Sequence, residues 1–316
     1  MAQFCHIPFC CNAWLGKGVH SVQMRGNAML LLAAFIWGTT FVAQMVGMDE
    51  LGPFSYAAAR FFLGMLFLLG LWYAVRGRRA DKKQAGTYMP GWRAGCGAGL
   101  IMFCASSTQQ VAMVYTTAGK TAFITALYIV LVPLAGHFLL RQRIALWNWL
   151  GAGLALVGLY FLSIHGAVEL NTGDAILMVS ALFWTAHILF VGHFAGLSDV
   201  IEMSLMQIAV CFVGSAVAAL LVEMPALTPM LHAWFPIFYG GVMSAGVAFT
   251  LQIVGQRYTQ PATASLLMSF EAVFGVLSSW LILGEVMSPA QVLGCTLMFA
   301  GILVTQAGPW LRRKNR

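Results

Sequence analysis

The sequence predicts an all-α integral membrane protein in which ten transmembrane helices form two inverted repeats of five helices. Three observations lead to this fold class: the composition, a set of ten apolar stretches, and an internal repeat. Hydrophobic residues make up 60% of the chain and charged residues only 9%, so a soluble domain of this composition would have almost nothing to place on its surface. The mean hydropathy of +0.82 agrees, and we expect the chain to lie in lipid.

The ten apolar stretches follow one another with short joints between them. Each is close to the roughly 20 helical residues that cross a hydrocarbon core of about 30 Å. The first five lie near residues 27–48, 54–75, 93–115, 118–140 and 146–164. The second five lie near residues 173–194, 201–222, 233–255, 262–283 and 289–308. We expect each stretch to form one transmembrane helix.

An internal repeat relates the two sets of five stretches. Early in the repeat, Trp37 recurs as Trp184, and we call the distance between these two positions the longer offset. Later in the repeat, Gln109 recurs as Gln252, which defines a shorter offset. A small difference in the length of one loop reconciles the two registers. Because each repeat has an odd number of crossings, the second copy enters the membrane upside down, as in many secondary transporters.

The repeat also sets the expected domain boundaries. The first repeat covers residues 26–165 and the second covers residues 173–308. Residues 1–25 contain neither a zinc-binding cysteine spacing nor a long apolar segment with a cleavage site, so we expect a disordered N-terminal tail. Residues 309–316 form a basic C-terminal tail.

Basic residues predict the orientation, because Lys and Arg are retained on the cytoplasmic side of a membrane. With the N-terminus inside, 15 of the 17 Lys and Arg residues fall inside or at that interface. These are Lys17, Arg25, Arg76, Arg78, Arg79, Lys82, Lys83, Arg93, Arg141, Arg143, Arg257, Arg312, Arg313, Lys314 and Arg316. Both termini are therefore predicted to be cytoplasmic, and the net charge of +7 reflects this bias and not a nucleic-acid-binding surface.

One carboxylate within an apolar stretch is the first candidate for function. Glu271 lies near the centre of the ninth stretch, where an ionisable group costs at least a few kcal/mol. Its helical neighbours Ala264, Gly275 and Ser278 are small, so this face can meet another helix or a cavity. We interpret Glu271 as a proton site or a substrate contact. The alternative is a buried carboxylate that bridges to a neighbouring helix, for instance to Arg60.

Other polar and aromatic residues recur at corresponding depths of the two repeats. Tyr128 occupies the repeat position of Glu271, and helical spacing places Thr40 on the face of Trp37 and His187 on the face of Trp184. Such positions converge on the repeat axis, where carriers keep their binding site. The candidate substrate-binding residues are Trp37, Thr40, Gln109, Tyr128, Trp184, His187, Gln252 and Glu271. For the neutral polar residues, hydrogen bonding between helices is the alternative role. For the two tryptophans the alternative is packing without a ligand, and for His187 it is a hydrogen-bonded core histidine.

Two basic residues fall outside the cytoplasmic set. Arg60 lies early in the second stretch and Lys120 opens the fourth. Both are possible charge partners of the site. The alternative is that they anchor the outer interface, because long basic side chains reach the headgroups by snorkelling.

Several motifs together resemble the EamA-type members of the drug/metabolite transporter superfamily. The motifs are residues 33–41 (AAFIWGTTF), 59–61 (ARF), 116–125 (TTAGKTAFIT), 127–133 (LYIVLVP), 269–274 (SFEAVF) and 283–285 (LGE). The resemblance covers essentially everything after residue 25. It implies a carrier of the bacterial cytoplasmic (inner) membrane, with a central cavity, that exports small metabolites such as amino acids. The Glu-Pro usual in this family is here Glu271-Ala272, so whether the ninth helix breaks at this point stays open.

The function we expect is secondary transport of a small metabolite by alternating access, with the bilayer as surroundings and protons as a possible coupling ion. We expect no cofactor, no metal and no enzymatic activity, because the sequence has no metal-ligand cluster and no phosphate-binding glycine loop. A membrane-embedded enzyme and a channel remain the alternatives. A channel would be expected to have rings of like charge or a carbonyl filter.

The charge pattern yields a first testable prediction, which concerns topology. The loop with Arg78, Lys82 and Lys83 should face the cytoplasm, and the loop with Asp49 and Glu50 should face outward. Single cysteines at positions 50 and 81 in a cysteine-free background, labelled from outside intact cells with an impermeant reagent, check this. Labelling of position 81 and not of position 50 would contradict the inverted repeat.

Overall fold

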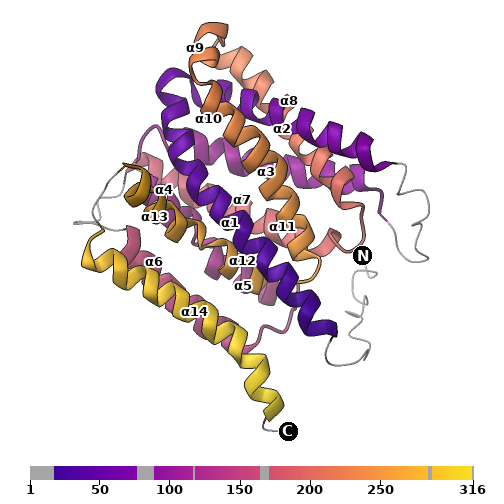
Figure 1. The fold of residues 1–316 in the computed structure, drawn as a ribbon, viewed down its shortest axis with the longest axis vertical. Helices are drawn as coiled ribbons and strands as arrows, with labels where there is room; N and C mark the ends of the chain where they lie inside the picture. Colours follow the sequence, from indigo (N-terminus) through magenta and orange to yellow (C-terminus); the bar gives the residue numbers. More distant parts are fainter. Residues whose placement is uncertain (1–17, 77–88, 117, 164–170, 284–286, 315–316) are drawn as a thin grey trace.

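The computed structural model describes residues 18–76, 89–116, 118–163, 171–283 and 287–314, and in these ranges the regular structure is helical throughout (Figure 1). Each of the ten predicted apolar stretches corresponds to helical structure. Two of the stretches are divided into separate helices, however, and a third contains a π-helix.

The described residues of the first half form six helices. They are α1 (Gly18–Glu50), α2 (Pro53–Val75), α3 (Gly91–Ala112), α4 (Ala118–Thr125), α5 (Tyr128–Phe138) and α6 (Leu146–Ser163). α4 and α5 together occupy the fourth predicted stretch.

In the second half, the part of the chain that the structure describes forms eight α-helices and a π-helix. They are α7 (Thr172–Phe194), α8 (Val200–Val222), α9 (Leu227–His232), α10 (Trp234–Phe238), the π-helix η2 (Tyr239–Ala248), α11 (Phe249–Gln256), α12 (Pro261–Met268), α13 (Glu271–Leu283) and α14 (Pro289–Lys314). The eighth predicted stretch is continuous through α10, η2 and α11, and the ninth is divided into α12 and α13.

Eight helical segments of the described chain are long and apolar enough to cross a membrane. They are Ser21–Asp49, Pro53–Val75, Thr121–Phe138, Thr172–Phe194, Val200–Val222, Trp234–Gln256, Pro261–Ser278 and Pro289–Ala307. The apolar segment Leu146–Leu162 is shorter. The chain is therefore a multi-span helical membrane protein.

The first helix begins earlier than the sequence indicated. Residues 1–17 lie outside the described part of the chain, but residues 18–25, which we expected to belong to a disordered tail, form the first two turns of α1. The segment from Val19 to Met24 contains neither proline nor glycine, so the helix can continue beyond the apolar stretch. The apolar pattern marks where a helix can enter lipid, and not where the helix starts.

Two helices break at equivalent positions of the repeat. α4 ends before Ala126-Leu127 and α12 ends before Ser269-Phe270, and the shorter offset relates these two dipeptides. Both breaks use tightened turns: the N–H of Leu127 donates to the carbonyl of Ile124 at 3.2 Å, and the N–H of Phe270 donates to the carbonyl of Leu267 at 3.4 Å. The ninth stretch thus breaks without a proline. Tyr128 and Glu271 begin the helices that follow.

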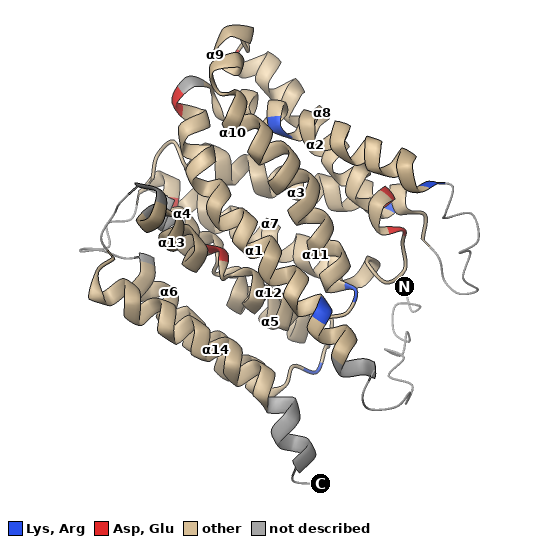
Figure 2. Cartoon of the chain, in the orientation of Figure 1, with Lys and Arg blue, Asp and Glu red and all other residues tan. Residues whose placement is uncertain are grey.

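Figure 2 shows how charge is distributed over this fold. Most of the Lys and Arg residues in the described chain lie on one side of the molecule, where α1 begins and α2 ends. At another end of the bundle, Glu223 follows α8 and accepts hydrogen bonds from the N–H groups of Phe54 and Ser55, at 2.8 and 2.7 Å. This carboxylate caps the N-terminus of α2, where the helix dipole favours negative charge. It joins a helix of the first half to one of the second.

Glycines let α6 and α14 cross closely, and the two helices lie side by side at one edge of the molecule (Figure 1). A β-carbon on Gly158 would lie 2.6 Å from the carbonyl oxygen of Gly294, and one on Gly151 would lie 2.7 Å from the carbonyl oxygen of Gly301. The shorter offset relates Gly151 to Gly294 and Gly158 to Gly301. Small residues of this kind let helix backbones approach in a membrane, where helices gain little from hydrophobic burial.

We predict that Gly158→Ala destabilises the protein and that Gly153→Ala does not. The added methyl group of Gly158→Ala must push α14 away, which costs on the order of 1–3 kcal/mol. Gly153 lies on the same helix, and a β-carbon there would have no atom within 4 Å. Alanine at this position should be neutral or slightly stabilising because of its higher helix propensity. Thermal unfolding of both variants in detergent measures the difference, and an equal midpoint for the two would contradict the close crossing.

Candidate functional site

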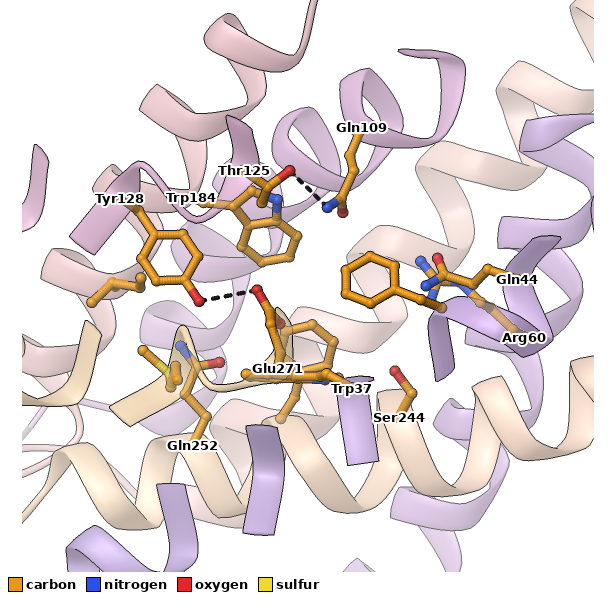
Figure 3. A pocket seen from close by; sticks show the side chains of 14 residues that line it. Trp37, Gln44, Arg60, Gln109, Thr125, Tyr128, Trp184, Ser244, Gln252 and Glu271 are labelled. Carbon is orange, nitrogen blue, oxygen red and sulfur yellow. Dashed lines mark hydrogen bonds between the residues drawn. The ribbon is translucent and has the colours of Figure 1, made fainter. Parts of the chain in front are cut away.

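A cavity lies where the broken helices meet α1, α3, α7 and the π-helix (Figure 3). Its empty volume is about 570 Å³, open solvent included. Its lining residues are Trp37, Phe41, Gln44, Arg60, Gln109, Thr125, Tyr128, Trp184, Ile188, Ser244, Phe249, Gln252, Met268 and Glu271. These residues come from both halves of the chain, and none comes from α6, α8 or α14.

Most of the lining consists of pairs that the sequence repeat relates. The longer offset pairs Trp37 with Trp184 and Phe41 with Ile188. The shorter offset adds three further pairs, which are Gln109 with Gln252, Thr125 with Met268, and Tyr128 with Glu271. Most of the 14 lining residues therefore occupy equivalent positions of the two repeats. Equivalent residues of the two halves thus line the cavity together.

Glu271 lies at the break between α12 and α13, next to α1. Its side chain is 7% exposed, and its Oε1 accepts a hydrogen bond of 3.0 Å from the hydroxyl of Tyr128. Gly38 allows this proximity, because a β-carbon there would lie 2.6 Å from the carbonyl oxygen of Glu271. As the first residue of α13, the carboxylate also lies at the positive end of a helix dipole.

Three aromatic rings form one wall of the cavity. Phe249 lies between the two repeat-related tryptophans, with its ring centre 4.9 Å from that of Trp37 and 6.1 Å from that of Trp184. The Trp184 and Phe249 rings are stacked, at an angle of 10°. The indole Nε1 atoms of both tryptophans are buried and have no hydrogen-bond partner within the described chain. The wall therefore offers apolar faces and two unused N–H donors.

Amide side chains supply the remaining polar surface. Gln109 donates to the hydroxyl of Thr125 at 3.1 Å, just before the break between α4 and α5. Gln252 donates to Gln256 at 3.1 Å, and Gln256 donates to the carbonyl of Ile188 at 2.9 Å. The Oε1 atom of Gln252 has no partner among the described residues. This oxygen is free to accept a hydrogen bond from a bound molecule.

Of the two possible charge partners, Arg60 lines the cavity. It is 6% exposed, so it does not snorkel to an interface as an anchoring residue would. It also forms no ion pair with Glu271: Figure 3 shows Arg60 and Gln44 at one end of the cavity and Glu271 with Tyr128 at the other. The side chain of Lys120 lies outside the part of the chain that the structure describes.

Two residues of the expected site do not line the cavity. The hydroxyl of Thr40 donates to the carbonyl of Ile36 at 2.6 Å, so its hydrogen bond is made within α1. His187 is buried with its Nε2 3.3 Å from the Oε1 of Gln207, and its ring contacts those of Trp184 and Phe249 edge-on. His187 supports the aromatic wall from outside the cavity. The other six expected residues lie together in the lining.

The lining also contains residues that we did not predict as part of the site. Phe41 and Ile188 are repeat partners, as are Thr125 and Met268, so the offsets could have found them once one member of each pair was chosen. Ser244 had no such signal. It lies in the π-helix η2, whose wider turn changes which residues share a face, and π-helical segments are frequent at functional sites.

The described residues contain no group of three or more His, Cys, Asp or Glu side chains that could hold a metal ion. The fold and the cavity together are typical of one class of protein: a helical membrane transporter with a chamber that residues from both halves of the chain line. The model of the EamA-like transporter family matches the chain twice, over residues 24–164 and 171–306. The chain belongs to this family, a branch of the drug/metabolite transporter superfamily, which confirms the resemblance seen in the motifs.

Similar proteins cover nearly the whole chain. An uncharacterized transporter from Archaeoglobus fulgidus is 30% identical over 291 residues, which cover 89% of this chain and 86% of that protein. The uncharacterized transporter YoaV of Bacillus subtilis is 24% identical over 87% of this chain and 94% of its own length. A solved structure titled "Crystal structure of protein" has a TM-score of 0.72 and 20% identity, covering 90% of this chain and 98% of that one. This last similarity supports the fold.

We predict that water reaches the cavity although its residues are buried. A cysteine replacing Ser244, in a background without the seven native cysteines, should react with a charged methanethiosulfonate in proteoliposomes. The matched control is Leu182→Cys on α7, which is 58% exposed but faces lipid, where thiolates do not form readily. Labelling of position 182 without labelling of position 244 would contradict an aqueous cavity.

Proposed function

We propose that this protein is a secondary transporter that moves a small metabolite, an amino acid or a related compound, out of the cell by alternating access. The observation that carries the proposal is the cavity lined by five repeat-related pairs with a carboxylate among them. Carriers with repeated halves keep their substrate site at the interface between the repeats. The names of the similar proteins support transport and do not name a substrate.

The repeat supports the proposed movement. In our proposal ten crossings form two inverted repeats, at residues 26–165 and 173–308, so that each half can take the conformation of the other. Rocking of the halves would then expose the cavity first to one side of the membrane and then to the other. The breaks before Tyr128 and Glu271 lie at equivalent positions and are the points where such helices can bend.

Each part of the lining has a proposed role toward the substrate. The rings of Trp37, Trp184 and Phe249 would pack against an apolar part of the molecule, and Gln109 and Gln252 would hydrogen-bond its polar groups. Behind the lining, His187 would hold the rings of Trp184 and Phe249 in place.

The carboxyl group of Glu271 has a separate proposed role. Tyr128 would fix its position through the hydrogen bond to Oε1. Because a charge in the membrane interior is costly, Glu271 would exchange a proton or a charged substrate group as the site changes sides. This exchange would link the charge state of the cavity to the direction in which it opens.

The orientation is part of the proposal. The basic side of the bundle (Figure 2) supports a cytoplasmic location of both termini under the positive-inside rule. The membrane would be the bacterial cytoplasmic membrane, and export would load substrate from the basic side.

Proteoliposomes loaded with a panel of amino acids and related metabolites test the proposal. Saturable counterflow of one solute, with or without an imposed pH gradient, is the expected result. Chemical conversion of the solute would instead indicate a membrane-embedded enzyme, and large unitary currents in planar bilayers would indicate a channel. A pH gradient that drives accumulation would establish coupling to protons.

We predict that Glu271→Gln abolishes most transport and its pH dependence. Gln keeps the size of the side chain and can still accept the hydrogen bond from Tyr128, but it cannot ionise. The variant should insert and fold normally, while the transport rate falls by at least about tenfold, equivalent to roughly 1.4 kcal/mol. Glu202→Gln, at the start of α8 and outside the cavity lining, is the matched control. A Glu271→Gln variant with the wild-type rate and pH profile would make Glu271 a structural residue.

A further inference from the structure

Arg60 is a buried cation that no carboxylate among the described residues neutralises. Its side chain is only 6% exposed, and its Nε has no hydrogen-bond partner within the described chain. In the part of the chain that the structure describes, no carboxylate pairs with it. Two aromatic rings lie close to it: the guanidinium carbon is 4.6 Å from the ring centre of Phe61 and 5.8 Å from that of Tyr56.

A buried charge without a partner is expensive, and the two rings offset only part of the cost. A cation–π contact is a weak attraction, whereas the penalty for burying an ion is much larger. An arginine cannot relieve this penalty by losing its proton, because a guanidinium stays protonated in proteins. The remaining cost can be met by an anion that enters the cavity.

The surroundings of Arg60 favour an anion as well. Figure 3 shows Arg60 beside Gln44, at the end of the cavity away from Glu271. A planar guanidinium also presents a fork of N–H groups that matches a carboxylate. The end of the cavity away from Glu271 is therefore suited to an acidic group.

We propose that Arg60 is a carboxylate-binding subsite of the cavity, so that the transported solute is a small organic carboxylate whose acidic group docks at Arg60. This proposal rests on the transport function proposed above and specifies the chemistry of its substrate. The rest of the solute lies along the aromatic wall toward Glu271. Because Glu271 is itself acidic, that end accepts a cationic or an uncharged group, and a second carboxylate there is excluded.

The Arg60 subsite is present in only one of the two repeats. The position equivalent to Arg60 in the second half is Gln207, at the longer offset, and Gln207 is engaged by His187 outside the lining. The second half therefore has no counterpart of the subsite. Most of the other lining residues occur as repeat-related pairs and would not by themselves distinguish the two ends of a solute. A solute whose carboxylate binds Arg60 would therefore take one orientation in the cavity.

Binding of matched pairs of carboxylates and primary amides to the full chain in lipid nanodiscs tests the proposal. The probes are benzoate and benzamide, 3-phenylpropionate and 3-phenylpropionamide, and L-phenylalanine and L-phenylalaninamide, with inorganic phosphate and phenyl phosphate as further anions. We expect at least one carboxylate to bind about tenfold or more tightly than its amide, as expected for a charge-assisted hydrogen bond. No binding of any carboxylate, or equal binding of acids and amides, overturns the proposal. Tighter binding of the phosphates overturns the assignment to carboxylates.

Two substitutions of Arg60 connect the preference to this residue. Arg60→Gln should remove the difference between acid and amide, and Arg60→Lys, which keeps the charge but not the fork, should reduce it and keep its sign. Arg93→Gln, at an exposed position on α3, is the control and should bind as wild type does. A preference that survives Arg60→Gln overturns the proposal, and so does its complete loss in a folded Arg60→Lys variant.

The outcomes also separate this proposal from the transport function. Counterflow in proteoliposomes with no preference for acids would leave transport standing and remove the carboxylate subsite. Binding of acids that depends on Arg60, without counterflow of any bound acid, would leave the subsite standing and remove the transport function.

Discussion

The arrangement of this protein depends on the cost of placing polar groups in hydrocarbon. Each backbone N–H and carbonyl must be satisfied within the protein, and each polar side chain must turn away from lipid. The chain is sorted accordingly: Leu182 and Leu221 lie on the surface, whereas Ser180, Gln207 and Glu271 are buried. The same rule explains why interrupted helices occur beside the cavity. Irregular backbone is tolerated at membrane depth where it is enclosed by protein or lines a polar space.

Helices in a membrane must pack against one another without the hydrophobic effect, and glycine allows this close packing. Lipid tails are as apolar as leucine side chains, so helices in a membrane associate through close contact of small residues. Gly158 and Gly294 do this between α6 and α14, away from the cavity. Gly38 does it between α1 and α13, next to Trp37 and Glu271 of the lining. One kind of contact thus holds the outer bundle together and positions the site.

The sequence predicted the helices and much of the cavity, for reasons that also explain what it missed. Apolar stretches locate helices because crossing lipid requires them. The repeat offsets paired Trp184 with Trp37 and Gln252 with Gln109, and the cost of an ionisable group in an apolar stretch singled out Glu271. Helical spacing could not show that Thr40 bonds back to its own helix, because a threonine hydroxyl can satisfy itself locally. The breaks in α4–α5 and α12–α13 occur without proline, so no residue marked them. From the sequence, Arg60 could be an interfacial anchor or a cavity residue; its burial and its place in the lining are visible only in the structure.

The two halves share most of the lining but differ in charge, and this difference bears on how the cavity can work. Arg60 belongs to the first half, with Gln207 at the equivalent position, and Glu271 belongs to the second half, with Tyr128 at its equivalent. Each half therefore contributes one charged residue to a cavity whose lining consists mostly of repeat-related pairs. The alternating access proposed above would require the halves to move relative to each other, and such a movement would change the separation of two groups held on different halves. A ligand shifts a conformational equilibrium only as far as its affinities for the two states differ. A bound molecule that contacts both Arg60 and Glu271 would therefore favour the conformation in which the distance between these two residues matches the length of the molecule.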